Sequence, residues 1–252
     1  MKLENTAAIV TGGASGLGAA TAAALVDQGA TVYAFDLASS IEKAPEVKGI
    51  VYVEVDVTSP EQVTAAVAQA ASGLEPLRTV VNCAGIGNAG RILNKGEVGD
   101  LGLYAKIVQV NLIGSYNVLA IAAAEIAKTE ADDNGQRGVI INTASVAAYD
   151  GQVGQAAYSS SKGGIVGLTL PAARDLGQYG IRVMTIAPGI IMTPMLMTVS
   201  EEFRAGLAAG VPFPKRLGDP SEYAKLALAI VDNDYLNGEV IRLDGSLRMA
   251  PR

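Results

Sequence analysis

The stretch Thr11-Gly12-Gly13-Ala14-Ser15-Gly16-Leu17-Gly18 decides the fold of this 252-residue chain. It follows a short apolar run, Ala7–Thr11, and opens an Ala-rich segment with helical spacing, Gly16–Gln28. Glycines in this spacing permit a tight turn and let the backbone approach a pyrophosphate, while the helix N-terminus supplies N–H groups and partial positive charge. With 29 glycines in the chain, the spacing alone also fits an ordinary glycine-rich turn. Its position between a strand and a helix predicts a dinucleotide-binding turn.

Short apolar runs alternate with longer segments of helical spacing along the whole chain. The expected strands are Ala7–Thr11, Thr31–Phe35, Ile50–Val55, Thr79–Asn82, Val139–Thr143, Arg182–Ile186 and Glu239–Leu243. The expected helices are Gly16–Gln28, Pro60–Ala71, Leu101–Lys128, Gln155–Tyr179, a lid-like segment around Pro194–Ala209, and Pro220–Val231. The strands are apolar nearly throughout, which is typical of a parallel sheet covered on both faces. The pattern predicts an α/β fold, a Rossmann-type doubly wound parallel sheet of about seven strands with helices on both faces.

Local signals support one domain over residues 1–252, with a cofactor half of about 1–145 and a catalytic and substrate half of about 146–252. Ser59-Pro60-Glu61-Gln62 and Asp219-Pro220-Ser221-Glu222 each place a cap residue, then Pro, then Gln or Glu, which predicts two helix starts. Gly87–Asp100 is the one long polar connection. The uncharged run Val183–Ser200 contains Pro and Gly, so we expect a buried strand leading into a loop rather than a membrane span.

Composition excludes several classes of function. Net charge is −6 with no basic cluster, so we expect no nucleic-acid partner. The chain has no histidine, which excludes a His general base, a Ser-His-Asp triad and a His-ligated zinc. The single cysteine, Cys83, excludes an intrachain disulfide, and we expect no metal site. Targeting and membrane signals are absent, so we expect a cytoplasmic protein whose acid–base chemistry uses Tyr, Lys, Asp or Glu.

Asp36 provides a second cofactor signal. It ends the second expected strand, twenty residues after Gly16, where an acidic side chain hydrogen-bonds the adenosine ribose 2′-OH. A carboxylate there repels a 2′-phosphate, and neither the next three residues nor the glycine loop supplies Lys or Arg. The position therefore predicts NAD rather than NADP; the alternative is a carboxylate that merely caps the strand end.

A tyrosine–lysine pair is the candidate for catalysis. Of nine tyrosines, Tyr158 alone has Lys four residues later, Lys162, which places both on one helix face. A neighbouring ammonium and an oxidised nicotinamide would stabilise the phenolate and lower the tyrosine pKa from about 10. Ser145 follows the strand Val139–Thr143, at the carboxyl edge of the sheet where ligands of open α/β folds bind.

These motifs together resemble the short-chain dehydrogenase/reductase family over essentially the whole chain. The matching residues are Thr11-Gly12-x-x-x-Gly16-x-Gly18, Asn82-Cys83-Ala84-Gly85, Asn111, Ser145, Tyr158-x-x-x-Lys162 and Pro188-Gly189. The minor departure is Cys83, where the family more usually has Ala or Asn. We interpret this thiol as a small buried residue rather than a nucleophile, because no base is paired with it.

The resemblance implies a role for each matching position. Tyr158 would be the general acid/base, Lys162 would bind the nicotinamide ribose, and Ser145 would hydrogen-bond the reacting oxygen. Asn111 would help to hold a water that relays the proton; the alternative is an asparagine that kinks a helix. The implied cofactor contacts are Gly12, Ser15, Gly16, Leu17 and Gly18 at the pyrophosphate, Asp36 at the ribose, Asp56 and Val57 at the adenine, Asn82, Cys83, Ala84 and Gly85 along the cleft, and Ile191 and Thr193 after Pro188-Gly189 at the nicotinamide.

Longer stretches resemble the type II 3-hydroxyacyl-CoA dehydrogenases within that family. They are Arg137–Ser145, Gly151–Tyr158, Val211–Pro214 with Arg216–Pro220, and Asn237–Gly245. The resemblance implies reversible NAD-linked oxidation of (S)-3-hydroxyacyl-CoA, a step of β-oxidation in fatty acid metabolism. Reduction of 3-oxoacyl groups on acyl carrier protein, oxidation of other secondary alcohols or hydroxysteroids, and a non-catalytic dinucleotide-binding scaffold stay open.

The family also implies a homotetramer, assembled through Leu101–Lys128 and Gln155–Tyr179, although the sequence fits a dimer as well. An apolar lid is expected from the region Val183–Ser200 together with Phe203, Val211, Pro212 and Phe213, and Met192, Met195 and Met197 would line it. Arg91 and Lys95 in the polar connection could meet a CoA phosphate or simply face solvent.

Overall fold

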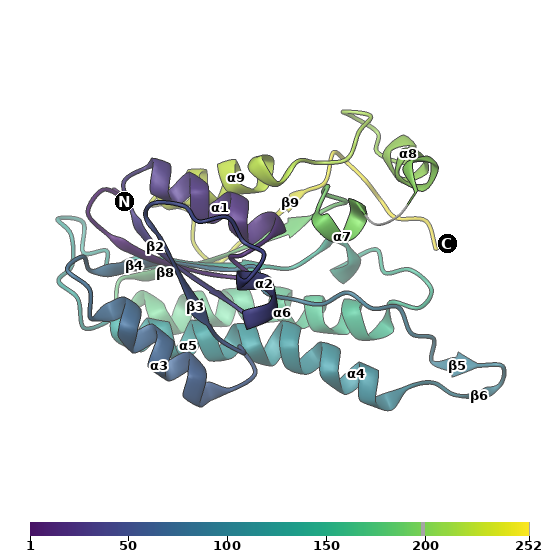
Figure 1. Cartoon of the computed structure of the whole chain (residues 1–252), viewed down its shortest axis with the longest axis horizontal. Coiled ribbons are helices and arrows are strands. Elements are labelled where there is room, and N and C mark those ends of the chain that lie inside the picture. The colour runs from purple at the N-terminus through teal and green to yellow at the C-terminus, as the bar shows by residue number, and fades with distance from the viewer. Residues whose placement is uncertain (198–199, 252) are drawn as a thin grey trace.

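A parallel sheet forms the middle layer of the protein, whose computed structural model describes residues 1–197 and 200–251 (Figure 1). Across these residues seven strands pair in one sheet, each with its neighbours in parallel. In spatial order they are β3 (Ile50–Glu54), β2 (Thr31–Asp36), β1 (Ala7–Thr11), β4 (Leu77–Asn82), β7 (Gly138–Thr143), β8 (Ile181–Pro188) and β9 (Val240–Leu243). The predicted fold class is confirmed, and all seven predicted strands are present with ends shifted by at most two residues.

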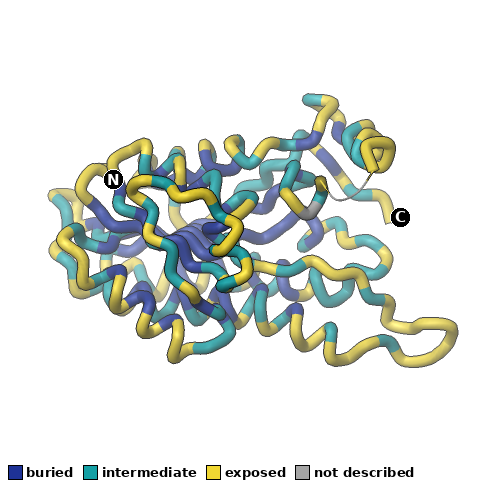
Figure 2. The backbone as a smooth tube through the Cα atoms, in the orientation of Figure 1, coloured by how far each residue is buried: buried dark blue, intermediate teal, exposed yellow. Residues whose placement is uncertain are grey.

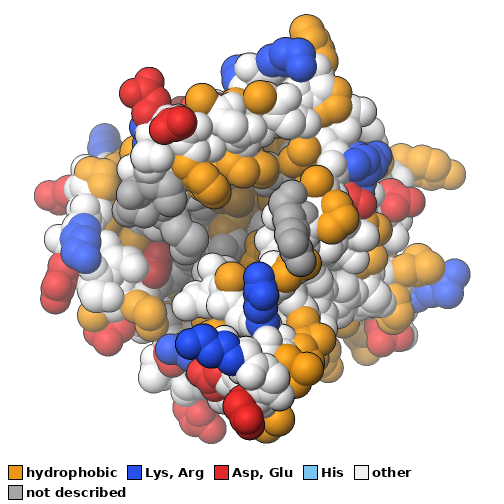
Figure 3. Space-filling model, turned by 90° about the vertical axis from the view of Figure 1, so that its right-hand side faces the viewer, with side chains coloured by type: hydrophobic (Ala, Val, Ile, Leu, Met, Phe, Trp, Pro, Cys, Tyr) orange, Lys and Arg blue, Asp and Glu red, His pale blue; other side chains and the backbone are white. Residues whose placement is uncertain are grey.

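The strand order places the candidate site. The chain runs outward from β1 to β2 and β3 on one side, and from β4 to β9 on the other. The connections from β1 and β4 therefore diverge at the carboxyl ends of these two strands, which opens the crevice in which doubly wound sheets bind ligands. Figure 3 looks onto this edge and shows a central hollow with hydrophobic side chains on its walls.

Helices cover both faces of the sheet (Figure 1). On one face lie α1 (Gly16–Asp27) and α9 (Pro220–Asp232), and on the other α3 (Pro60–Ala71), α5 (Ser115–Ile126) and α6 (Ala156–Gly177). Each layer packs its apolar side chains against the sheet, so the central strands are buried on both sides (Figure 2). This double burial explains why the strands carry continuous apolar runs instead of alternating ones.

The two predicted helix starts are confirmed, with one difference. At α9, Asp219 and Glu222 form a reciprocal capping box, in which the Asp219 N–H donates to Glu222 Oε2 at 2.8 Å. At α3, Ser59 Oγ accepts from the Gln62 N–H at 3.3 Å, but the Gln62 side chain accepts instead from the Asp56 N–H at 2.9 Å. The second half of that cap therefore ties the helix to the end of β3.

The long helix predicted at Leu101–Lys128 is interrupted by a wide turn. It consists of α4 (Leu101–Val108), a π-helical turn at Gln109–Gly114, and α5. A Cβ on Gly114 would collide with the Val57 side chain, so glycine lets the turn pack against the loop after β3. By length and composition Leu101–Ile126 could cross a membrane, yet in this fold it packs against α3 and α6.

Two other segments differ from the prediction. The polar connection Gly87–Asp100 contains an antiparallel hairpin, β5 (Leu93–Asn94) and β6 (Glu97–Val98), whose turn residues Lys95 and Gly96 both have positive φ. The predicted lid forms two helices, α7 (Pro194–Met197) and α8 (Glu201–Ala209), and Thr198 and Val199 between them lie outside the described residues. Short helices also form at α2 (Ala38–Ile41) and at Val146–Ala148.

The apolar lid expected from composition is partly wrong. The first part of this region, Val183–Pro188, belongs to the buried strand β8 rather than to a lid. Val211 is buried, but the Phe203 and Phe213 side chains are 57% and 81% exposed, so they do not close over a core.

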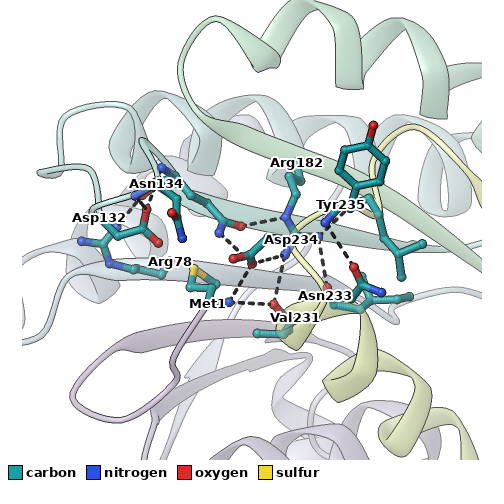
Figure 4. A network of polar contacts seen from close by, with 12 residues as sticks. Met1, Arg78, Asp132, Asn134, Arg182, Val231, Asn233, Asp234 and Tyr235 are labelled. Atoms are coloured by element: carbon teal, nitrogen blue, oxygen red, sulfur yellow. Dashed lines mark hydrogen bonds and ion pairs between the residues drawn. The ribbon is translucent and has the colours of Figure 1, made fainter.

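A polar network fastens the opposite edge of the sheet (Figure 4). Arg182, buried at the start of β8, donates to Gln136 Oε1 at 2.7 Å and lies 3.8 Å from the Asp234 carboxylate. Its other donors reach the carbonyl oxygens of Ile230, Val231 and Leu236 at 2.9–3.0 Å. The Met1 amino group donates to the same Asp234 carboxylate at 2.7 Å. One guanidinium thus joins β8, the end of α9 and the segment before β9.

Candidate active site

The glycine loop lies between β1 and α1, as predicted, and its shape depends on missing Cβ atoms. Gly12 and Gly16 have φ of +64° and +54°, which favours glycine. A Cβ on Gly18 would collide with the Gly12 carbonyl, and a Cβ on Gly12 would approach the Ala84 backbone at 3.0 Å. The Ser15 hydroxyl makes no capping bond to the described residues, so the first turn of α1 keeps its N–H groups for a ligand.

Asp36 reaches this loop from the end of β2. Its Oδ2 accepts from the Ala14 N–H at 3.0 Å, and its Oδ1 accepts from the Leu37 N–H at 2.8 Å. The carboxylate therefore does cap its strand end, but it also fixes the glycine loop and stays partly exposed beside it. Its charge at this position opposes a further phosphate group.

The loop after β3 forms the far side of the crevice. Asp56 Oδ1 accepts from the Thr58 N–H at 2.9 Å and from the Thr58 hydroxyl at 2.7 Å, which makes a rigid turn. The Val57 carbonyl accepts from Asn117 Nδ2 at 3.0 Å, and the Val57 side chain packs against Gly114. Of the two residues predicted at the adenine, Val57 is therefore tied to α5, and Asp56 is held by Thr58 and by Gln62 of α3.

The turn Asn82–Gly85 forms the floor of the crevice next to the glycine loop. The Ala84 N–H donates to Thr11 Oγ1 at 3.0 Å, and the Cys83 N–H donates to the Thr11 carbonyl at 3.2 Å. A Cβ on Gly85 would lie 3.6 Å from the Lys162 Nζ atom. This floor therefore joins the glycine loop to the predicted catalytic pair.

The structure brings the four predicted catalytic residues together at this edge. Tyr158 and Lys162 lie one turn apart on α6, with the Lys162 ammonium 5.8 Å from the centre of the Tyr158 ring. Lys162 is buried and donates to the Thr143 carbonyl at 2.8 Å. Ser145 begins the short helix after β7, where its hydroxyl accepts from the Ala147 N–H at 3.1 Å.

Asn111 lies in the π-helical turn, buried next to this pair. Its side chain exchanges two hydrogen bonds with the Ile86 backbone, at 2.8 and 2.9 Å, and donates to Ser161 Oγ at 3.1 Å. Its carbonyl accepts from the Ser115 hydroxyl at 2.8 Å. Asn111 thus joins the segment after β4 to α6, and the π-helical turn coincides with this connection.

The pKa shifts correct one expectation from the sequence. Burial raises the pKa of the Tyr158 hydroxyl above its ordinary value, and the Ser145 hydroxyl, lowering it, offsets part of this effect. Burial lowers the pKa of the Lys162 ammonium to about 8. The expected lowering of the Tyr158 pKa by Lys162 is wrong in this structure, because Lys162 donates to Thr143 and the dominant effect on the phenol is desolvation.

The segment after β8 closes the crevice from the other side. The Gly189 N–H donates to the Leu243 carbonyl at 2.9 Å, and a Cβ on Gly16 would lie 3.6 Å from Thr193 Cγ2. Ile191 is buried with its side chain in the core beside α9, and its bridge to Gly218 uses the backbone of its neighbours. A cofactor contact at Ile191 would therefore come from its backbone.

Two of the predicted residues lie apart from this group, and two others were missed. Arg91 and Lys95 are exposed in the connection that carries the hairpin, which projects from the body of the molecule (Figure 1). Sequence reasoning missed Thr143, which holds Lys162, and Tyr223, whose hydroxyl lies 2.7 Å from Thr143 Oγ1. Thr143 was recognisable as the last residue of a predicted strand, but nothing in the sequence pairs it with Tyr223.

The site as a whole fits a nicotinamide dinucleotide. The Cβ-free cradle at Gly12 and Gly18, the open first turn of α1 and the Asp36 carboxylate match a pyrophosphate and a ribose. The buried Lys162 and the half-buried Tyr158 lie where the reactive end would face a substrate.

Comparisons with known proteins agree with this geometry. The sequence profile described as short chain dehydrogenase matches residues 6–203. The chain is 53% identical over 254 residues to a Bos taurus protein named 3-hydroxyacyl-CoA dehydrogenase type-2, covering 99% of this chain and 97% of that one. It is 51% identical to the Drosophila melanogaster protein of that name, covering 99% and 100%. A crystal structure of 3-hydroxyacyl-CoA dehydrogenase type-2 from Mycobacterium avium superposes with a TM-score of 0.92 at 44% identity, covering 98% of each chain.

Proposed function

Because this chain belongs to the short-chain dehydrogenase family, we propose that it catalyses the reversible oxidation of (S)-3-hydroxyacyl-CoA to 3-oxoacyl-CoA with NAD. The protein is an oxidoreductase, and the family implies a nicotinamide dinucleotide as its cofactor. The observation that carries the choice of substrate is the 53% identity, over the whole chain, to relatives named for this reaction. The intact set of Tyr158, Lys162, Ser145 and Asn111 supports an enzyme over a non-catalytic scaffold.

Tyr158 is the proposed general acid/base. In the oxidative direction its phenolate accepts the proton of the substrate C3 hydroxyl, while Ser145 hydrogen-bonds the same oxygen. When bound, NAD supplies the acceptor for the hydride that leaves the same carbon, so one proton and one hydride leave the substrate together. The burial that raises the Tyr158 pKa keeps the phenol protonated, which suits its role as the acid in the reductive direction.

Lys162 and Asn111 are the proposed supporting residues. The Lys162 ammonium, still largely protonated at neutral pH, would bind the nicotinamide ribose. Asn111 would hold a water for proton relay, through the π-helical turn where its carbonyl and side chain are fixed. In this proposal residues 1–145 mainly hold the cofactor, and residues 146–252 mainly supply the catalytic pair and the substrate walls.

NAD rather than NADP is the proposed cofactor. Asp36 stands at the glycine loop with both carboxylate oxygens hydrogen-bonded to the backbone, so its charge is held in place. The other cofactor contacts, from Gly12 to Thr193 along the chain, are proposed at the positions that the resemblance to the short-chain dehydrogenase/reductase family implies. Acetoacetyl-CoA reduction, followed with NADH and NADPH in parallel, tests substrate and cofactor together. Turnover mainly with NADPH, or faster turnover of the acyl carrier protein thioester, would favour a carrier-protein reductase instead.

A homotetramer is the proposed assembly. Apolar side chains on α4, the π-helical turn and α5 remain exposed, among them Leu101 at 74% and Tyr116 at 52%. Covering them in partner contacts would remove apolar surface from water. Light scattering at micromolar concentration should give four times the chain mass, and a monomer would refute the proposal.

A cytoplasmic location also stays a proposal. The single thiol, Cys83, is largely shielded beneath the crevice, and the fold requires no oxidising compartment. Fractionation of the source cells with an antibody against the chain would test it.

A further inference from the structure

A ring of three hydrogen bonds lies beneath the floor of the crevice. The Tyr223 hydroxyl lies 2.7 Å from Thr143 Oγ1, Thr143 Oγ1 donates to Cys83 Sγ at 3.7 Å, and the Cys83 thiol donates to the Tyr223 hydroxyl at 3.7 Å. If Tyr223 donates to Thr143, each of the three groups donates once and accepts once. The members come from α9, β7 and the turn after β4, so the ring joins three elements far apart in the chain.

The ring stands where the backbone pairing of two strands stops. The ladder between β4 and β7 ends at the pair Asn82 and Asn142. The next residues along the two strands are Cys83 and Thr143, and their side chains continue the contact that the backbone no longer makes. Tyr223, entirely buried, bridges both of them from α9. Its hydroxyl thus connects the two strand ends at the position where the next backbone pairing between β4 and β7 would lie.

The end of β7 holds the Lys162 head group, and the turn after β4 faces it. The Thr143 carbonyl accepts from Lys162 Nζ at 2.8 Å, and a Cβ added to Gly85, in the turn that begins at Asn82, would lie 3.6 Å from the same nitrogen. The separation of the two ends therefore sets the space in which the ammonium sits. On the side that faces β8, the Thr143–Ala144 peptide is held by the hydrogen bond from the Ala144 N–H to the Ile186 carbonyl at 2.8 Å. The side of Thr143 that has no strand partner therefore faces Cys83.

We propose that Tyr223 is a positioning residue for Lys162, acting through Thr143 and Cys83 to fix the two strand ends between which the ammonium binds the cofactor ribose. The inference rests on the proposed role of Lys162 in holding that ribose. It also accounts for the departure from the family at Cys83, because alanine at this position could not complete the ring. Tyr223 itself touches neither substrate nor cofactor in this scheme.

Tyr223→Phe, Thr143→Val and the double variant test the proposal. Each single variant removes one hydroxyl from the ring, and we expect each to raise the dissociation constant of NADH about threefold to tenfold. The double variant should bind NADH no more weakly than the weaker-binding single variant, because both changes break the same connection. Thr143→Ser retains the hydroxyl and should bind NADH like the unchanged protein. The KM for acetoacetyl-CoA should stay within about twofold, since the ring does not face the substrate.

The matched control is Thr169→Val. It removes a buried hydroxyl that lies 2.7 Å from the Thr185 hydroxyl, about two turns along α6 from Lys162, and that is bonded to neither Thr143 nor Lys162. We expect a lower melting temperature with an unchanged NADH dissociation constant. If Tyr223 merely stabilised the fold, Tyr223→Phe would behave in this way too, and that result would overturn the proposal. Independent, multiplying effects of Tyr223→Phe and Thr143→Val would also overturn it.

NADH binding is measured by fluorescence without any thioester, so failure of the proposed reaction does not obscure the result. A protein that binds NADH but leaves acetoacetyl-CoA unchanged would refute the proposed substrate. The effects of the Tyr223 and Thr143 variants on NADH binding could still be measured. Should Tyr223→Phe fail to fold, Thr143→Val against Thr143→Ser still decides: equal NADH affinity in these two refutes the proposal, and weaker binding by the valine variant alone supports it.

Discussion

Replacing Arg182 with methionine should destabilise the protein strongly while leaving catalysis unchanged. The side chain is 6% exposed, and its guanidinium donates to Gln136 Oε1 and to three backbone carbonyls at 2.7–3.0 Å. Methionine retains most of the apolar stem but leaves four oxygens, three of them on buried residues, without this donor. An unsatisfied buried polar group costs about 1–3 kcal/mol, and partial hydration beside the half-exposed Asp234 reduces the sum. We expect a loss of about 3–5 kcal/mol, typical of removing one partner from a buried polar network.

Thermal unfolding followed by circular dichroism measures this loss. For a domain of this size, about 2–4 °C of melting temperature corresponds to each kcal/mol, so the variant should melt about 6–20 °C lower. Arg216→Met is the control, because Arg216 pairs with Glu222 on the exposed surface and should change the melting temperature little. The KM for NADH should stay unchanged, since the network lies at the opposite edge of the sheet. A melting temperature for Arg182→Met within about 2 °C of the parent would refute the reasoning.

Three further predictions concern the candidate site. Tyr158→Phe should lower kcat for acetoacetyl-CoA about 10²- to 10⁴-fold with unchanged NADH binding; near-normal turnover of the folded variant would remove Tyr158 as the acid/base. Asp36→Asn keeps an acceptor for the Ala14 N–H but removes the charge, so kcat/KM with NADPH should rise about tenfold or more; an unaltered preference for NADH would contradict the assigned role. Burial lowers the Lys162 pKa to about 8, so the folded chain loses this proton between pH 8 and 10.5, where the unfolded chain still holds it. Stability from this group therefore rises with pH across that window, whereas NADH affinity should fall above about pH 8 and stay flat in Lys162→Met; a flat titration of the parent would be the contrary result.

The fold was largely predictable because its signals are local. Continuous apolar runs mark the buried strands, and the Pro-containing caps at Ser59 and Asp219 mark where two helices begin. The π-helical turn at Gln109–Gly114 left no such signal, because one extra residue in a helical turn barely changes the spacing of the hydrophobic residues. The hairpin at β5 and β6 was missed because four residues pair through a turn at Lys95-Gly96 that resembles any polar loop.

The candidate site was predictable residue by residue but not in its connections. Spacing identified Tyr158 and Lys162, and position after a strand identified Ser145 and Asp36. The sequence could not show that Lys162 donates to the Thr143 carbonyl, because that contact depends on how α6 lies against the end of β7. It also could not show that burial outweighs the Ser145 hydrogen bond in setting the Tyr158 pKa, since desolvation is a property of the packed molecule.

The wide turn at Gln109–Gly114 makes chain length, and not only residue identity, a constraint on this helix. Each residue added to or removed from a helix rotates everything beyond it by about 100°. Deleting one residue here would turn α5 about its axis and carry Asn117 away from the Val57 carbonyl, while Asn111 stayed with the preceding half. At the turn Lys95-Gly96, none of the described residues lies within 4 Å of a Cβ added to Gly96, so this turn should accept insertions. Two neighbouring stretches of the same chain therefore differ sharply in the lengths that a functional variant can tolerate.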